Sequence, residues 1–185
     1  LNSPSQDKRD AIDEFEEGIV LATYAGLSRA LGKLVKKIMK SGKVKNVVVP
    51  NDALIARVAK RIQCIVPDEA TKLGNHASLT FKIVNKLRKS TPFFYELAGR
   101  PFGRDPMMLW PQLNLIDGGG TLGDTLGLYR AAFFTEKQNY WGGFEYEFKK
   151  SMKKDLHRIL QHRSISYRWD ECIDLPPRVT QVEEV

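Results

Sequence analysis

Cysteine and histidine are scarce in this sequence, with two cysteines and three histidines among 185 residues. Cys64 and Cys172 do not form a Cys-x-x-Cys pair, and the histidines lack the spacing of metal ligands, which excludes a disulfide scaffold and a zinc module. No uncharged apolar run approaches the roughly 18 residues that a membrane-spanning helix needs, and no signal peptide is evident. These absences predict a globular chain in a reducing compartment, with no membrane partner.

Acidic residues are fewer than basic residues in this sequence. Lys and Arg number 29 against 22 Asp and Glu, so the net charge is 29 − 22 = +7. A basic surface attracts polyanions, nucleic acid first and anionic membranes second. The alternative is a basic domain whose charge serves only solubility.

Short apolar runs alternate with amphipathic segments in the first part of the chain. Residues 19–23, 47–49, 63–66 and 93–97 have the composition of buried strands. Helical spacing predicts three inward faces, formed by Leu31, Leu34, Val35 and Ile38, by Leu54, Ile55, Val58 and Ile62, and by Leu79, Ile83 and Leu87. This alternation predicts an α/β fold in which a parallel sheet is flanked by helices.

A lysine stripe accompanies the first predicted helix, over residues 31–40. Its members repeat the apolar spacing two positions later and would therefore lie on the opposite face of a helix: Lys33, Lys36, Lys37 and Lys40. This stripe is either a contact surface for nucleic acid or a solvated outer face, and the pattern alone leaves both open.

The amino-acid composition and the predicted secondary structure change near residue 106. An aromatic-rich, mostly helical extension is predicted there, with a glycine loop at 118–120 and a turn-rich insert at 139–143. A basic helix over residues 149–163 and an extended, proline-containing tail around 174–179 follow. We therefore expect a boundary between residues 1–105 and 106–185.

The strongest chemical signal is an apolar strand that ends in Asp68-Glu69. A parallel strand delivers such carboxylates to the sheet edge where phosphates bind. There Asp holds Mg²⁺ and Glu polarises the attacking water in many NTPases. The alternative is an ordinary polar turn or helix cap.

A second glycine-rich segment has only the spacing of a phosphate loop. In Gly118-x-x-x-x-Gly123-Asp124-Thr125, a carboxylate stands where the phosphate-binding lysine belongs. This carboxylate would repel a nucleotide, so the segment is interpreted as a flexible turn between helices.

Further segments accompany Asp68-Glu69 in a characteristic order. They are Tyr24-Ala25-Gly26-Leu27, Asn75-His76-Ala77-Ser78, Leu97-Ala98-Gly99-Arg100-Pro101, Leu109-Trp110-Pro111-Gln112, Tyr129-Arg130, Phe133-Phe134 and Leu175-Pro176. This order resembles the first motor lobe of the Swi/Snf-type, superfamily-two helicases and translocases, particularly their phage and prophage branch. Asp68-Glu69 is similar to the family's DExx motif II, residues 97–101 to its "LTGTP" motif III, Tyr24 to its "TYxxL" loop, and Leu175-Pro176 to the "LP" before the second lobe.

The resemblance implies a fold, an activity and a set of site residues. Residues 1–105 would form a partial RecA-like lobe, and residues 106–185 a helical protrusion and linker. The activity would be ATP hydrolysis coupled to movement on duplex DNA, in the cytoplasm of a bacterial or phage-infected cell. ATP and Mg²⁺ would be cofactors, with Asp68 as the metal ligand through the nucleotide and Glu69 assisting hydrolysis. Gly99, Arg100 and Pro101 would couple hydrolysis to movement, and the expected DNA contacts are Tyr24, Lys33, Lys36, Lys37, Lys40, Arg104, Lys153 and Lys154.

Three departures from the family pattern bear on activity. Ala98 and Arg100 replace the usual threonines of motif III, Pro67 precedes Asp68, and no GxxxxGK(S/T) phosphate loop occurs in the 185 residues. The chain is therefore interpreted as an inactive part of a motor that needs a second lobe or a missing N-terminal segment. The alternative is a non-catalytic nucleic-acid-binding or assembly module derived from such a lobe.

Overall fold

The computed structural model describes residues 12, 17–100, 102 and 105–167. The chain divides into two compact units between Phe148 and Lys149, and each unit is described by itself. The boundary expected after residue 105 stays a prediction. None of the described helices is long and apolar enough to cross a membrane.

Three capped helices form the main core of the first unit. They are α2 (Tyr24–Leu31), α3 (Asp52–Ala59) and α4 (Leu79–Arg88), and α4 contacts both of the others. The side chains of Thr23, Asn51 and Ser78 accept backbone N–H groups in their first turns, as N-caps do. The buried side chains include Leu31, Leu54, Ile55, Val58, Ile83 and Leu87. The helices predicted over residues 52–62 and 79–87 are thus confirmed, with α3 ending earlier.

A second cluster lies on the other side of α4. It joins Phe81 and Val84 of α4 to Leu73 of the short helix η1 (Ala70–Leu73) and Leu115 of α5 (Leu109–Asp117). Arg88 reinforces this contact because its guanidinium donates hydrogen bonds to two carbonyls at the end of α5, of Leu115 at 2.6 Å and Ile116 at 2.7 Å. Helix α5 is therefore held against α4 by both apolar packing and charge-assisted hydrogen bonds.

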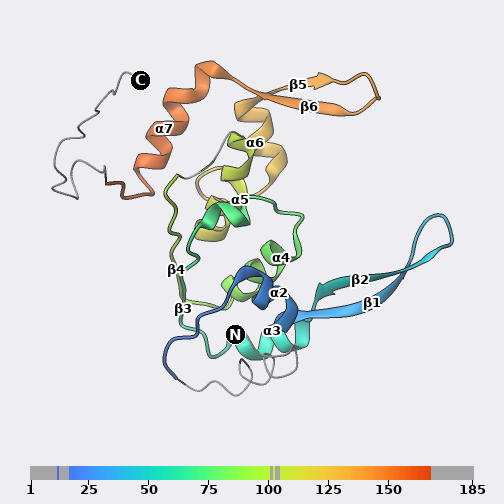
Figure 1. Cartoon of the computed structure of the whole chain (residues 1–185). Coiled ribbons are helices and arrows are strands. Elements are labelled where there is room, and N and C mark those ends of the chain that lie inside the picture. Colours follow the sequence, from blue (N-terminus) through green and yellow to red (C-terminus); the bar gives the residue numbers. More distant parts are fainter. Residues whose placement is uncertain (1–11, 13–16, 101, 103–104, 168–185) are drawn as a thin grey trace, which may run out of the picture. The chain divides into compact units, whose positions relative to one another are not determined.

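One parallel strand pair is present among the described residues. β3 (Cys64–Ile65) pairs with β4 (Phe93–Phe94), and Tyr95 continues the ladder by donating its N–H to the carbonyl of Ile65 at 3.1 Å. The expected parallel pairing between residues 63–66 and 93–97 is confirmed. The strands lie side by side in Figure 1.

The larger parallel sheet that the sequence predicted is not found in the described chain. The other sheets are two antiparallel hairpins, so the described fold is mixed helix and strand with three two-stranded sheets. Residues 19–23 form no strand and are exposed, because this apolar run finds no neighbouring strand and instead leads into the N-cap of α2.

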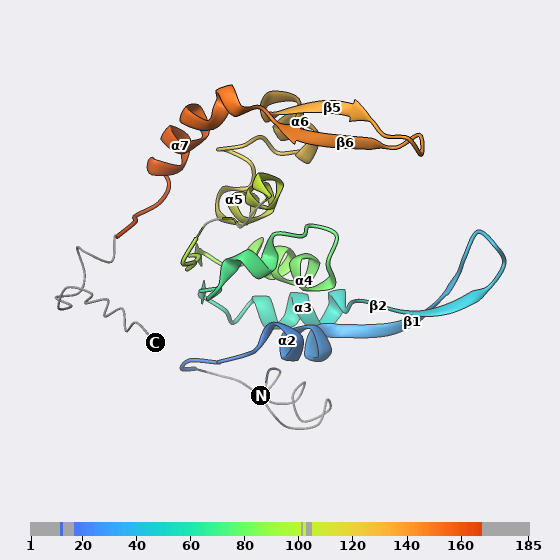
Figure 2. The same ribbon diagram turned by 45° about the horizontal axis from the view of Figure 1, so that its top comes forward.

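The helix predicted over residues 31–40 is wrong, because this segment is the first strand of a hairpin. β1 (Gly32–Ile38) pairs with β2 (Val44–Pro50) through a tight turn in which Gly42 has φ +76°. The β-branched residues of both strands favour the extended backbone, and glycine adopts positive φ without a steric cost. The lysines of the predicted stripe are therefore distributed over both hairpin faces and the turn, and Figure 2 shows the hairpin as a two-stranded ribbon.

A second hairpin interrupts the extension that was expected to be mostly helical. After η2 (Pro106–Met108) and α5, helix α6 (Leu126–Phe133) runs directly into β5 (Phe134–Gln138), which pairs with β6 (Phe144–Phe148). The glycine segment between α5 and α6 is a turn between helices, as predicted. Two features require glycine at position 119. Its φ is +104°, and a Cβ there would lie only 2.3 Å from the Cα of Asp124.

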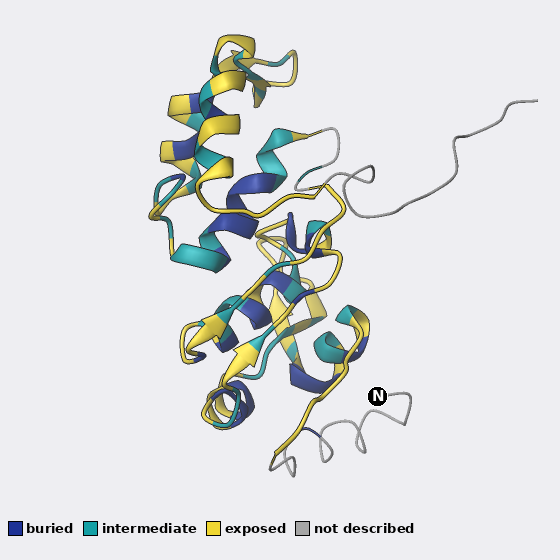
Figure 3. Cartoon of the chain, turned by 90° about the vertical axis from the view of Figure 1, so that its left-hand side faces the viewer, coloured by how far each residue is buried: buried dark blue, intermediate teal, exposed yellow. Residues whose placement is uncertain are grey.

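The second unit contains the predicted basic helix. It comprises η3 (Lys150–Met152) and α7 (Lys153–Gln161), in which Leu156 is buried. The extended tail predicted around residues 174–179 lies outside the described residues. Figure 3 shows that buried positions gather on the helices, whereas the strands are largely exposed.

Leucine truncation tests the packing of α5. Leu115 is fully buried and Leu128 on α6 is 56% exposed, so the two form a matched pair. We expect Leu115→Ala to lower the free energy of unfolding by about 2–5 kcal/mol, since it leaves a cavity. Leu128→Ala should change it by less than about 1 kcal/mol. Chemical denaturation measures both values, and equal losses would contradict this packing.

Candidate functional site

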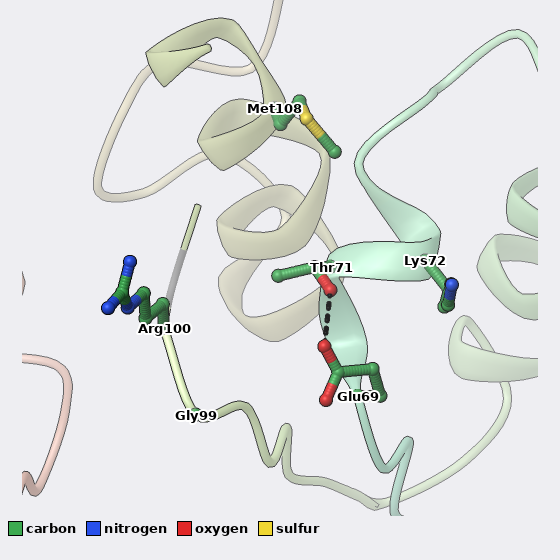
Figure 4. A pocket seen from close by; sticks show the side chains of 6 residues that line it. All are labelled: Glu69, Thr71, Lys72, Gly99, Arg100 and Met108. Carbon is green, nitrogen blue, oxygen red and sulfur yellow. Dashed lines mark hydrogen bonds between the residues drawn. The ribbon is translucent and has the colours of Figure 1, made fainter. Parts of the chain in front are cut away.

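The ends of the two parallel strands bring the predicted site segments together. Asp68 and Glu69 follow β3, and Gly99 and Arg100 follow β4, so both pairs lie at the carboxyl edge of the strand pair, where ligands of such folds gather. An open pocket of about 560 Å³ is formed here. Its lining consists of Glu69, Thr71, Lys72, Gly99, Arg100 and Met108 (Figure 4).

Glu69 has an unusual backbone conformation. Its φ of +53° is the only positive value among the described non-glycine residues, and this left-handed region costs such a residue about 1–2 kcal/mol. The Asp68 carboxylate accepts the N–H of Glu69 at 2.9 Å, and the Thr71 hydroxyl donates to Oε1 of Glu69 at 3.0 Å. Strained conformations of this kind cluster at functional sites. The turn therefore holds the Glu69 carboxylate in a defined position, as Figure 4 shows.

Tyr24 reaches the same turn from α2. Its hydroxyl donates a hydrogen bond to the backbone carbonyl of Asp68 at 2.7 Å. Burial raises the pKa of Tyr24 to about 12, and the negative charges of Glu96, Asp68 and Glu69 contribute. Tyr24 thus remains a protonated donor at neutral pH, and three segments that are distant in the sequence meet at Asp68.

Glu96 belongs to this neighbourhood, although no sequence motif predicted a role for it. Burial raises its pKa to about 8, and its buried Oε1 has no hydrogen-bond partner. The carboxyl group is therefore mostly protonated at neutral pH, which limits repulsion from the Asp68–Glu69 pair. The available signal was a single glutamate within the apolar run Phe93-Phe94-Tyr95-Glu96-Leu97.

The remaining predicted site residues do not line this pocket. Lys33, Lys36 and Lys37 are exposed on β1, and Lys40 is exposed in the turn that follows. Lys153 and Lys154 are exposed on α7, in the second unit. Pro101 and Arg104 lie outside the described residues. Thr71, Lys72 and Met108 do line the pocket and were not predicted, because their contribution depends on how η1 and η2 pack.

Three of the segments that carried the family resemblance make side-chain contacts near η2, and two of them contact each other. The His76 ring meets Trp110 edge-on, with ring centroids 6.1 Å apart, and the Trp110 indole donates to the carbonyl of Gly123 at 2.8 Å. The Tyr129 hydroxyl donates to the carbonyl of Pro106 at 2.9 Å. A second pocket, of about 290 Å³, adjoins these contacts and shares Met108 with the first.

The carboxylates of Asp68 and Glu69 are the candidate metal ligands at this site. No group of three or more His, Cys, Asp or Glu side chains that could hold a metal occurs within the described residues. Two carboxylates alone bind Mg²⁺ loosely, since such sites usually borrow phosphate oxygens from a substrate. Asp68 and Glu69 by themselves therefore supply only part of the ligand set that Mg²⁺ needs.

The comparisons with known proteins return no match. No protein-family model matches the chain, and no similar protein was found among the curated proteins or the solved structures.

The raised pKa of Glu96 predicts a pH-dependent stability. The carboxyl titrates near 4.5 when solvated and near 8 in the folded chain, so the folded state binds more protons between these values. The free energy of unfolding should consequently fall as pH rises from about 4.5 to 8 and then level off. Glu96→Gln removes this titration, so the variant should lose this component and exceed the wild type in stability at pH 9. Thermal unfolding at pH 5, 7 and 9 measures this.

The exposed residue Glu136 on β5 provides the matched control. Glu136→Gln should keep the pH dependence of the wild type. The same slope in both variants would contradict a buried, protonated Glu96.

Proposed function

We propose that the chain is part of an ATP-dependent DNA helicase or translocase and contributes the carboxylate side of its nucleotide site. The observation that carries this proposal is the convergence of Tyr24, Asp68-Glu69 and Gly99-Arg100 at one edge of a parallel strand pair. The order of these segments in the sequence resembles that of the first motor lobe of the Swi/Snf-type family, and their meeting in space supports the proposal that they act together. A partial RecA-like lobe is part of this proposal.

The two carboxylates have separate proposed roles. Asp68 would hold Mg²⁺ through the nucleotide, and Glu69 would orient the water that attacks the terminal phosphate. The bound metal would supply positive charge to the phosphate oxygens. The Thr71 hydroxyl and the left-handed turn fix the Glu69 carboxylate, which is the property that a water-orienting group needs.

Arg100 and Lys72 give the pocket positive charge but no phosphate cradle. Lys72 and Arg100 flank the Glu69–Thr71 pair in Figure 4, with the Arg100 guanidinium pointing away from Glu69. A phosphate loop binds through consecutive backbone N–H groups and a lysine, and no such loop occurs in the 185 residues. Turnover would require a phosphate loop and a second lobe from outside this sequence. Residues 99–101 would couple turnover to movement.

Duplex DNA is the proposed partner of the lysine-rich surfaces. Six lysines and no acidic residue occur in residues 32–50, and a two-stranded ribbon fits the major groove of B-DNA. Lys153 and Lys154 add a second basic surface on α7. Because lysines contact phosphates without reading bases, the binding would be independent of sequence.

A non-catalytic nucleic-acid-binding or assembly module is the second candidate function. Arg100 in place of the motif III threonine and the missing phosphate loop favour it for the chain by itself. It differs from the first candidate in needing no nucleotide.

Nucleotide turnover by the purified chain tests the first part of this proposal. We expect no ATP hydrolysis above background with Mg²⁺, with or without duplex DNA, because the phosphates have no cradle. Phosphate release measures turnover, and Glu69→Gln is the control for trace contamination. DNA-stimulated release that disappears in Glu69→Gln would contradict the expectation of an inactive chain.

Charge reversal tests DNA binding. Lys36→Glu with Lys40→Glu, and Lys153→Glu with Lys154→Glu, should each weaken duplex binding at low salt and flatten its dependence on salt concentration. The slope of log K against log salt should fall by about one for each lost phosphate contact. Fluorescence anisotropy over a salt series measures this.

Lys60→Glu with Lys89→Glu is the matched control. It makes the same change in net charge at exposed positions after α3 and α4. If all three double variants weaken binding equally, only net charge matters and no defined lysine surface binds DNA.

A further inference from the structure

The two hairpins have similar architecture and opposite charge. Residues 32–50, the β1–β2 hairpin, hold six lysines and no acidic residue, a net charge of +6. Residues 134–148, the β5–β6 hairpin, hold three glutamates and one lysine, so their net charge is 1 − 3 = −2. Each strand pair directly follows a helix and turns through a glycine with positive φ, +76° for Gly42 and +78° for Gly142.

One face of the β1–β2 hairpin, here called the apolar face, carries two exposed apolar cross-strand pairs with Lys36 and Asn46 between them. Leu34 lies opposite Val48, and Ile38 lies opposite Val44, so the four side chains share a face. Leu34 is 66% exposed and Ile38 is 74% exposed. A two-stranded hairpin is only marginally stable when its apolar face meets water, and exposed apolar patches mark interaction sites.

The tip of the β5–β6 hairpin presents two aromatic side chains to solvent. Tyr140 is 93% exposed and Trp141 is 88% exposed, and their rings meet edge-on with centroids 5.3 Å apart. Oδ1 of Asn139 accepts the N–H of Trp141 at 3.1 Å and that of Gly143 at 2.8 Å. This turn is preorganised, and Tyr and Trp are the residues that most often anchor protein interfaces.

We propose that this aromatic tip docks on the apolar face of the β1–β2 hairpin of a second copy of the chain. The acidic charge of the β5–β6 hairpin disfavours a polyanion or an anionic lipid surface as its partner. The partner must therefore offer apolar surface surrounded by positive charge. The β1–β2 hairpin offers both, because Lys36 lies on the apolar face between the two apolar pairs, and Lys33 and Lys37 lie on the opposite face of the same hairpin.

The contact is heterologous, because different surfaces of the two copies meet. A dimer in which both contacts form reciprocally closes, whereas single contacts would propagate into a chain. Each aromatic side chain buries about 150–250 Å², while a standard interface buries about 800 Å² per partner. A single tip contact is therefore small, and we expect a weak, concentration-dependent dimer that high salt dissociates.

Complementation between two variants tests this inference. The tip variant is Tyr140→Ser with Trp141→Ser, and the ribbon variant is Leu34→Thr with Ile38→Thr, which keeps β-branched residues in the strand. Sedimentation equilibrium should show concentration-dependent association of the wild type. Each variant alone should associate at least about tenfold more weakly, which corresponds to a loss of about 1.4 kcal/mol. An equimolar mixture should form a 1:1 heterodimer, since the intact tip of one variant meets the intact ribbon of the other.

A control variant removes other exposed apolar side chains. Ile165→Ser with Tyr167→Ser, at positions outside both hairpins, should associate as the wild type does.

A second pair of variants addresses folding defects. Lys36→Glu, and Glu136→Lys with Glu145→Lys, should each weaken the dimer, and mixing them should restore it because the charges are exchanged.

Three results would overturn the inference. They are a wild type that stays monomeric over the whole concentration range, a mixture of variants that stays monomeric, and loss of oligonucleotide binding in the tip variant without any change in association. The last result would assign the tip to nucleic acid. Because neither ATP nor DNA is present in the sedimentation experiment, its failure is distinct from failure of the proposed motor function.

Discussion

Two backbone hydrogen bonds to Leu97 hold the candidate site together. The N–H of Leu97 donates to the carbonyl of Pro67 at 2.9 Å, and its carbonyl accepts the N–H of Ala70 at 2.9 Å. Asp68 and Glu69 therefore span a gap whose two ends are fixed to one residue of the neighbouring strand. A two-residue connection between fixed ends has few allowed conformations, which accounts for the positive φ of Glu69. The same pairing places Gly99 and Arg100 two and three residues beyond the anchor, opposite the carboxylates.

The charge of the site depends on how far each of its three carboxyl groups is buried. Asp68 and Glu69 are exposed, whereas Glu96 is largely buried and its pKa is raised to about 8. Tyr24 also keeps its proton, since its pKa is raised to about 12. The site thus presents the Glu69 carboxylate to the pocket, with Asp68 beside it in the turn, and keeps the buried groups mostly neutral at neutral pH. A protonated Glu96 adds little to the charge that a metal with bound phosphates would meet.

The sequence predicted correctly those helices and strands whose caps and apolar spacing match the way they pack in the fold. Helices α3 and α4 have polar N-caps and a single apolar spacing, and β3 and β4 are apolar runs beside Asp68 and Glu96. Residues 32–38 were misassigned because Leu34, Val35 and Ile38 satisfy the helical period, while Leu34, Lys36 and Ile38 also satisfy the strand period. The burial of Glu96 and the lining by Met108 depend on contacts across the fold, which no local pattern contains.

The second hairpin did have a local signal. Phe144-Glu145-Tyr146-Glu147-Phe148 alternates strictly between aromatic and acidic residues, and a turn with two glycines precedes it. Because the segments on either side were predicted to be helical, this alternation was not interpreted as a strand. Pairing in the structure places Phe134 opposite Phe148, and the Arg130 guanidinium lies 4.3 Å from the centre of the Tyr146 ring. The aromatic face of the hairpin is thus anchored on α6, whereas its tip is left to solvent.

The lysines of the β1–β2 hairpin have a role in both proposals, and this shared role has a thermodynamic consequence. DNA would neutralise the same +6 charge that attracts the acidic hairpin of a second copy. Two partners that bind the same charged surface weaken each other's binding. Thermodynamic linkage requires the factor by which each affinity falls to be the same in both directions. If both proposals are correct, duplex DNA must therefore weaken self-association by the same factor by which self-association weakens DNA binding. Lys36, which lies on the apolar face, would then contribute to both equilibria, whereas Tyr140 and Trp141 would contribute to self-association alone.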